Sequence, residues 1–140
     1  IDESVQSFID AGVPAEKIGI GIDFYGYVWT GVSEPMEGWE SGNAPNVEDN
    51  VPYHDIVADY EISSHRSWDS GAEAVYLSIP GDPPTFVSYD DEQSVEAKFD
   101  YVRENGLGGT IIWEIGGGYL PDSTSGPRDP LLQSVKTHSQ

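Results

Sequence analysis

The sequence predicts an α/β fold in which two helix–strand units flank a small α+β insertion. Residues 1–29 and residues 89–140 each combine an amphipathic helical pattern, a glycine that ends it, and an apolar run typical of a strand. Residues 30–88, between them, are rich in turn residues and contain short stretches of alternating polarity. Because a helix followed by a buried strand is half of a βαβ repeat, we expect two parallel strands with flanking helices.

The first unit is predicted as a helix over residues 2–11, ended by Gly12, and a strand over residues 17–25. The strand candidate ends in one acidic and two aromatic residues. The helix is expected to bury one face, because three apolar residues recur at helical spacing: Val5, Phe8 and Ile9.

The insertion is predicted to begin with a loop, since residues 30–50 are rich in Gly, Pro, Ser, Asn and Glu. Residues 52–60 then resemble a short helix with Pro52 at its first position, where a missing N–H is tolerated. Alternation over residues 72–79 and 85–89, separated by a proline-rich turn, predicts a β-hairpin.

The second unit begins at Asp90 and Asp91, and we expect both carboxylates to cap a helix at the positive end of its dipole. Gly106 is expected to end this helix, and residues 110–113 are apolar on both faces, as in a strand covered on both sides. The helix should bury a single stripe of apolar residues: Val95, Phe99 and Val102.

The C-terminal segment follows this strand. The glycine run at residues 116–118 is predicted to be a flexible turn, because no lysine or helix start accompanies it as a phosphate loop would require. Residues 129–135 are expected to form a final short helix, with an Asp N-cap followed by Pro.

The composition excludes several function classes. With 25 acidic and 6 basic residues in 140, the net charge of -19 repels nucleic-acid phosphates and anionic membranes, so we expect neither as a partner. The chain has no cysteine, and its three histidines show no ligand spacing, so no metal and no cofactor are expected. No apolar run has the length of a membrane span. The chain does not begin with methionine, so we expect a fragment or a processed product.

Residues 12–29 (GVPAEKIGIGIDFYGYVW) and residues 86–118 (FVSYDDEQSVEAKFDYVRENGLGGTIIWEIGGG) together resemble the C-terminal part of a family 18 glycoside hydrolase of the chitinase type. The resemblance covers almost the whole chain. It implies a partial TIM barrel, with barrel strands seven and eight and the family's α+β insertion. A complete barrel needs about 250 residues, so this chain is not one. The family's catalytic Asp-x-x-Asp-x-Asp-x-Glu motif and its Met-x-Tyr-Asp strand are both absent from the sequence.

By this resemblance, Trp113 matches the tryptophan that floors the central sugar subsite, where a pyranose ring stacks on an aromatic face. The alternative is an ordinary core aromatic residue. Tyr25 matches a family tyrosine, and Phe24 and Tyr27 are further candidates for substrate contact; Tyr27 stands where the family pattern has arginine, which puts that contact in question. Two more aromatic residues extend an aromatic rim or pack the insertion: Trp29 and Trp39.

Two carboxylates lie at the ends of the predicted strands. Asp23 stands where the family pattern has proline, and Glu114 follows Trp113, although strand alternation would turn Glu114 away from that tryptophan. As the ends of neighbouring strands, Asp23 and Glu114 are the candidate pair for a two-carboxylate glycosidase. Helix capping is the competing explanation for the acidic pair Asp90 and Asp91.

The resemblance implies a substrate-assisted mechanism, in which a Glu protonates the glycosidic oxygen and the sugar's N-acetyl carbonyl attacks the anomeric carbon. Because that Glu is absent from this chain, three functions stay open. They are a chitinase-like segment that hydrolyses O-glycosyl bonds when complemented, a non-catalytic carbohydrate-binding module, and an independent glycosidase using Asp23 and Glu114.

The expected ligand is a β-linked, amino-sugar oligo- or polysaccharide. Two parallel strands alone leave unpaired edges and an uncovered apolar face, so we expect self-association or pairing with an N-terminal half. We expect a secreted, bacterial-type protein, since such proteins often contain no cysteine.

Overall fold

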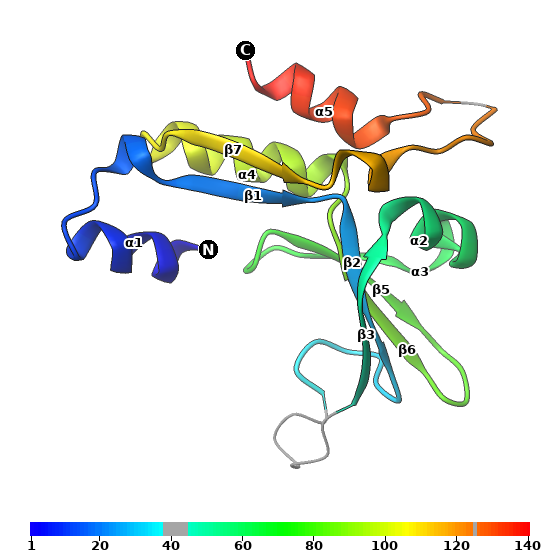
Figure 1. Cartoon of the computed structure of the whole chain (residues 1–140). Coiled ribbons are helices and arrows are strands. Elements are labelled where there is room, and N and C mark those ends of the chain that lie inside the picture. The colour runs from blue at the N-terminus through cyan, green and yellow to red at the C-terminus, as the bar shows by residue number, and fades with distance from the viewer. Residues whose placement is uncertain (38–44, 125) are drawn as a thin grey trace.

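The computed structural model describes residues 1–37, 45–124 and 126–140, and it contains two separate sheets. The first has two strands, β1 (Gly19–Asp23) and β7 (Gly109–Trp113), which run parallel in a register that ends with Asp23 opposite Trp113. Figure 1 shows the two strands side by side, although 85 residues of the chain lie between Asp23 at the end of β1 and Gly109 at the start of β7. The predicted pair of parallel strands is therefore confirmed.

The second sheet has five antiparallel strands in the order β3-β2-β6-β5-β4 and lies beside one end of the first. The predicted hairpin is confirmed as the pair β5 and β6. The predicted loop before the insertion helix contains a strand, β3, and β4 was not predicted either. The strands are β2 (Tyr25–Thr30), β3 (Asn46–Pro52), β4 (Arg66–Asp69), β5 (Ala74–Ile79) and β6 (Thr85–Tyr89).

The chain leaves the first sheet and enters the second at Phe24, inside the segment predicted as one strand. The Phe24 N–H donates to the carbonyl of Trp113 at 2.8 Å, and the Phe24 carbonyl accepts from the N–H of Tyr53 at 3.0 Å. The second sheet thus begins at Tyr25, and the barrel-type strand is shorter than the predicted residues 17–25.

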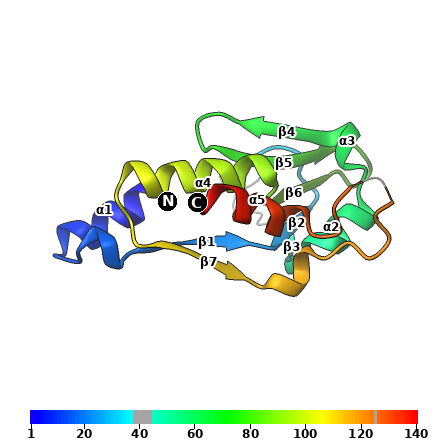
Figure 2. The same ribbon diagram turned by 90° about the horizontal axis from the view of Figure 1, so that it is seen from above.

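The helices cover one side of β1 and β7 and one side of the second sheet, and Figure 2 shows α4 running along the two parallel strands. Helix α1 buries only Val5 of its predicted stripe, and Phe8 is exposed. The helices are α1 (Asp2–Asp10), α2 (Tyr53–Asp59), α3 (Ile62–His65), α4 (Glu92–Glu104) and α5 (Pro130–His138), with short 3-10 turns η1 (Ala15–Lys17) and η2 (Ile115–Gly118).

The two acidic residues before α4 have different roles. Asp91 caps the helix as predicted: its carboxylate accepts from the N–H of Ser94 at 3.1 Å, and its own N–H donates to the Ser94 hydroxyl at 2.9 Å. Asp90 does not cap. It is buried and accepts hydrogen bonds from the Lys98 ammonium at 2.5 Å, the Ser94 hydroxyl at 2.8 Å and the Asp23 N–H at 2.9 Å. The prediction of capping was wrong for Asp90 because its partner Lys98 lies two helical turns away.

The glycine run after β7 is packed, and the expectation of a flexible turn was wrong. A Cβ on Gly117 would lie 2.3 Å from the carbonyl oxygen of Phe24, and one on Gly118 would lie 2.7 Å from the Phe24 ring. Only glycine allows η2 to approach Phe24 this closely. The main core continues from Phe24 between the second sheet and helices α2, α4 and α5.

Candidate functional site

One face of the two parallel strands is open. In β1, Ile20 and Ile22 are buried, whereas Gly21 is exposed, and the Asp23 carboxylate lies 3.8 Å from the position of a Cβ on Gly21. Asp23 therefore shares the face of Gly21, opposite to the isoleucines. Residues in register on neighbouring strands project to the same side, so Trp113 joins Asp23 at the C-terminal end of this open face.

Trp113 is not a core residue. It is 65% exposed, and Ile111, two residues earlier on the same strand, is 66% exposed. The two side chains therefore form one exposed apolar surface at the C-terminal half of β7. A cavity of about 50 Å³ adjoins it, lined by Phe24, Tyr25, Asn50, Pro52, Trp113, Glu114 and Gly117.

The ring of Phe24 is not available as a stacking surface. Its side chain is 1% exposed and packs against Gly118, so Phe24 belongs to the core that supports the site. The expectation that its ring contacts substrate does not fit this burial. Sequence patterning missed the difference because Phe24 sits where the chain changes sheets, and there the alternation of a single strand does not apply.

Asp23 lies in a polar environment built by three neighbouring groups. Partial burial raises the pKa of the Asp23 carboxyl above its ordinary value; the nearby Lys98 ammonium opposes this rise, and the Asp90 carboxylate adds to it. The nearby Tyr25 hydroxyl has the smallest influence and lowers the pKa of the Asp23 carboxyl. For Tyr25, burial and the charge of Asp23 raise the pKa to about 12, so its hydroxyl remains a hydrogen-bond donor at neutral pH.

Glu114, the other predicted carboxylate, is exposed directly after β7, and the Trp113–Glu114 peptide bond is cis. It lines the small cavity together with Tyr25 and Trp113, whereas Asp23 is not part of that lining. The structure thus groups Asp23 with Trp113 on the open sheet face, and Glu114 with Trp113 at the cavity.

A row of aromatic rings leads from this strand end across the outer face of the second sheet. The ring centroids are 5.8 Å apart for Tyr25 and Tyr27, 5.7 Å for Tyr27 and Trp29, and 5.4 Å for Trp29 and Phe86. Tyr76 follows Phe86 at 5.4 Å. Sequence reasoning missed Phe86 and Tyr76, although the alternation of their strands places both on the face opposite to the core. Trp39 lies outside the described residues.

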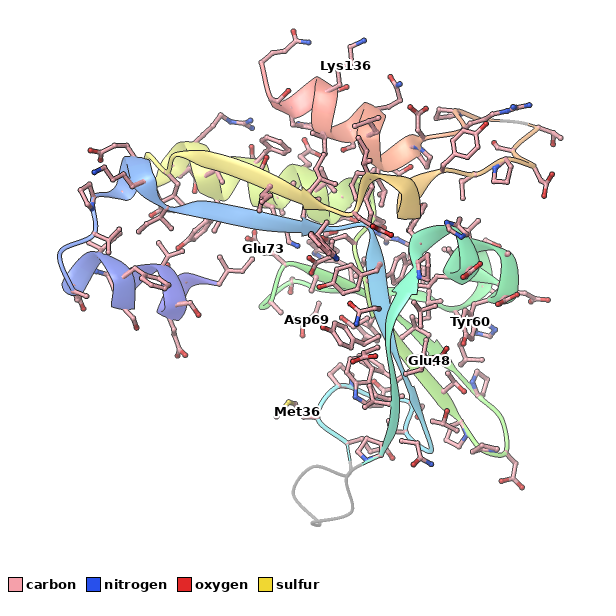
Figure 3. The ribbon with its side chains drawn as sticks, in the orientation of Figure 1. Met36, Glu48, Tyr60, Asp69, Glu73 and Lys136 are labelled. Carbon is pink, nitrogen blue, oxygen red and sulfur yellow. The ribbon has the colours of Figure 1, made fainter. Side chains whose placement is uncertain are left out.

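Trp29 and Phe86 of this row border a groove of about 420 Å³. Figure 3 shows Met36, one of its lining residues, on the part of the molecule that lies away from β1 and β7. The groove is lined by Trp29, Val32, Glu34, Pro35, Met36, Glu37, Pro45, Phe86 and Ser88.

In the part of the chain that the structure describes, no three acidic or histidine side chains gather closely enough to hold a metal ion. The helices of the same residues are all too short or too polar to cross a bilayer.

The profile of the family described as "Glycosyl hydrolases family 18" matches residues 1–118. The chain belongs to this family. Chitinase A1 of Niallia circulans is 33% identical to it over 127 residues, which cover 80% of this chain. Among solved structures, a family 18 N-acetylglucosaminidase from Paenibacillus barengoltzii superposes with a TM-score of 0.72 at 34% identity over 98% of this chain. The protein YKL-39, solved in the presence of chitooligosaccharides, superposes with a TM-score of 0.75 at 25% identity over 99% of this chain.

The family 18 match confirms the partial-barrel interpretation. The chain spans 17% of the length of Chitinase A1, 38% of the N-acetylglucosaminidase and 39% of YKL-39. It is therefore a chitinase-like, partial family 18 domain, and β1 and β7 are strands of the family's barrel.

Proposed function

We propose that this chain forms the sugar-binding C-terminal part of a chitinase-like domain that acts on or binds a β-linked amino-sugar polysaccharide. The observation that carries the proposal is the exposed indole of Trp113 at the C-terminal end of a parallel barrel strand, the face at which barrel enzymes bind their ligands. The presence of chitooligosaccharides in the structure of YKL-39 supports this ligand class.

In this proposal the chain supplies binding and orientation. A pyranose ring stacks on Trp113, while the Tyr25 hydroxyl and the Asp23 carboxylate offer hydrogen bonds to sugar hydroxyl or amide groups. Tyr27 continues the aromatic surface beyond Tyr25. The general acid of the family's Asp-x-x-Asp-x-Asp-x-Glu motif has no counterpart in this sequence, so hydrolysis requires strands from outside it.

Calorimetric titration with a tetramer of β-linked N-acetylglucosamine tests the binding role. Trp113→Ala should weaken binding by about tenfold or more, which corresponds to about 1.4 kcal/mol. Ile111→Ala is the matched control, because Ile111 has the same exposure on the same strand and face but lies before the strand end. Equal affinities for the two variants and the unaltered chain would contradict the stacking role of Trp113.

Activity measurements on the isolated chain, and on its mixture with the missing strands, distinguish the three candidate functions. Hydrolysis of a chromogenic chitooligosaccharide should appear only when the missing barrel strands are supplied as a second polypeptide. Binding with no turnover in that mixture would favour a carbohydrate-binding module. Turnover by the isolated chain that disappears in Glu114→Gln would instead favour the independent glycosidase with Asp23 and Glu114.

We also infer that the open face and edges of β1 and β7 are covered by another polypeptide. Among the described residues, each of these strands pairs only with the other, and Ile111 and Trp113 leave apolar surface exposed beside them. The occupant is either the remaining barrel strands or a second copy. Sedimentation of the isolated chain should show self-association that decreases in Ile111→Glu, and a stable folded monomer at high concentration would contradict the inference.

A further inference from the structure

Strand β3 contains a β-bulge beside the candidate site. The register of β2 and β3 shifts between Gly26 and Val28. Tyr27 therefore lies opposite two residues of β3, Asp49 and Asn50, one more than a regular ladder allows. Bulges of this kind are common next to active sites, where they redirect a side chain.

The backbone of Asn50 occupies the left-handed region, with a φ of 54°. Glycine adopts this region at the lowest cost, and asparagine tolerates it better than most other residues do. Glycine would therefore satisfy the backbone of the bulge, which does not need the carboxamide of Asn50. Asn50 is exposed, so its side chain is accessible to a ligand.

Asn50 lines the cavity of about 50 Å³ next to Trp113. The C-terminal end of β3 lies near the C-terminal ends of β1 and β7 (Figure 1), and the 3.0 Å hydrogen bond from the Tyr53 N–H to the Phe24 carbonyl fixes it there. The cavity is far smaller than the roughly 300 Å³ of a pocket that encloses a whole small ligand. It can therefore take a substituent of a sugar chain that passes over Trp113, but not a ring.

The polar side chains around this cavity differ in the hydrogen bonds that they can make. The carboxylate oxygens of Glu114 only accept, and the Tyr25 hydroxyl is already close to the acceptor Asp23. The carboxamide of Asn50 adds N–H donors that carry no charge. An acetamido carbonyl oxygen only accepts, so it can pair with Asn50 and not with the carboxylates.

We propose that Asn50 is a further substrate-binding residue, whose carboxamide N–H donates to a carbonyl or hydroxyl oxygen of the sugar unit next to the one stacked on Trp113. This inference rests on the proposed carbohydrate function. Asn50 belongs to the five-stranded sheet and not to the barrel strands, so it reaches the sugar chain from the side of the insertion. The acetamido carbonyl of the unit on Trp113, which attacks the anomeric carbon in the implied mechanism, is left free.

Calorimetric titration with the N-acetylglucosamine tetramer tests this role in two variants. Asn50→Gly removes the whole carboxamide and should weaken binding about fivefold, as expected for the loss of one neutral hydrogen bond. Asn50→Asp keeps the shape of the side chain but has no N–H donor, so it should weaken binding at least as much. Both replacements tolerate a positive φ, so the bulge should be preserved in each variant.

The matched control is Glu73→Gly. Glu73 is exposed and has a φ of 51°, but it directly precedes β5 and does not line the cavity. This variant should bind the tetramer as the unaltered chain does. A loss in Glu73→Gly equal to that in Asn50→Gly would assign the effect to the backbone and overturn the inference.

Two further outcomes separate this inference from the proposed function. Full affinity in Asn50→Gly or in Asn50→Asp, with binding still weakened in Trp113→Ala, would overturn the role of Asn50 and leave the carbohydrate function intact. An unaltered chain that does not bind the tetramer would overturn both.

Discussion

The two sheets of this chain differ in how completely they bury their own apolar residues. In the five-stranded antiparallel sheet, the inward side chains of Val75, Leu77 and Val87 have no exposed surface, because helices α2, α4 and α5 pack against them. In the two-stranded parallel sheet, one face packs on α4 while the other exposes Ile111 and Trp113.

The well-packed antiparallel sheet is expected to provide most of the stability, whereas the open face of the parallel strands is expected to provide a binding surface. The five-stranded antiparallel sheet buries one face against helices and leaves the other face solvated, as antiparallel sheets commonly do. Parallel strands usually need cover on both faces, so the exposed face of β1 and β7 is the part of the molecule where another chain segment or a ligand is expected. The candidate site lies where these two regions meet.

The largest loss of stability is expected from breaking the Lys98–Asp90 ion pair, which lies between the two sheets. Lys98→Met removes the cation that pairs with Asp90 and leaves the charge of this buried carboxylate uncompensated. The same carboxylate accepts the hydrogen bond from the Asp23 N–H. Unfolding in urea should show a loss of about 4 kcal/mol. Asp100→Asn, which breaks the exposed pair with Arg103 on the same helix, should change stability by less than about 1 kcal/mol. Similar losses for both variants would mean that the Lys98–Asp90 pair is not a buried link.

The next prediction compares how much one truncated side chain in each sheet lowers the free energy of unfolding. Leu77→Ala creates a cavity in the antiparallel sheet's core and should lower the free energy of unfolding by about 3 kcal/mol. Ile111→Ala shortens a side chain on the open face and should lower it by less than about 0.5 kcal/mol in the unassociated chain. If Ile111→Ala proved as damaging as Leu77→Ala, the face of β7 would be covered in solution.

The smallest effect concerns the charge of Asp23. Because burial raises the pKa of this carboxyl in the folded state, its ionisation opposes folding above its ordinary pKa, and the penalty is absent at low pH where both states are protonated. Asp23→Asn should therefore be more stable than the unaltered chain at pH 7, by less than about 1 kcal/mol given the partial exposure of the group. The advantage should disappear at about pH 3, below the ordinary pKa of an aspartate. Thermal unfolding at the two pH values measures it, and a less stable variant at pH 7 would reverse the assigned sign.

Local sequence signals predicted the elements whose residues carry their own pattern. The apolar stripe and Asp91 cap of α4, the β-branched run of β7 and the alternation of β5 and β6 are all properties of short segments. Strand β3 has the polar sequence NVEDNVP and is largely exposed, so no hydrophobic pattern marks it, and only pairing with β2 makes it a strand. The change of sheet at Phe24 has the same explanation, since residues 17–25 form one uninterrupted pattern and only tertiary contacts divide it.

The site was predictable to a similar extent. A strand that ends in Trp113 and a strand that ends in Asp23 mark a candidate functional edge, and the register places the two opposite each other. The pairing of Lys98 with Asp90 and the aromatic row through Phe86 and Tyr76 depend on contacts between elements. Phe24 was a candidate for substrate contact because it belongs to the aromatic end of the first predicted strand, whereas its ring fills the core.

The most direct test of the account is the NMR spectrum of the indole N–H groups during titration with the N-acetylglucosamine tetramer. The chain has four tryptophans, each giving one such signal, which single substitutions assign. If this strand end binds sugar, the Trp113 signal should shift progressively to saturation, while that of Trp68, on the edge strand β4 of the second sheet, should stay in place. A saturable shift confined to Trp68, or an unchanged Trp113 signal at saturating ligand, would contradict the claim that this strand end binds sugar.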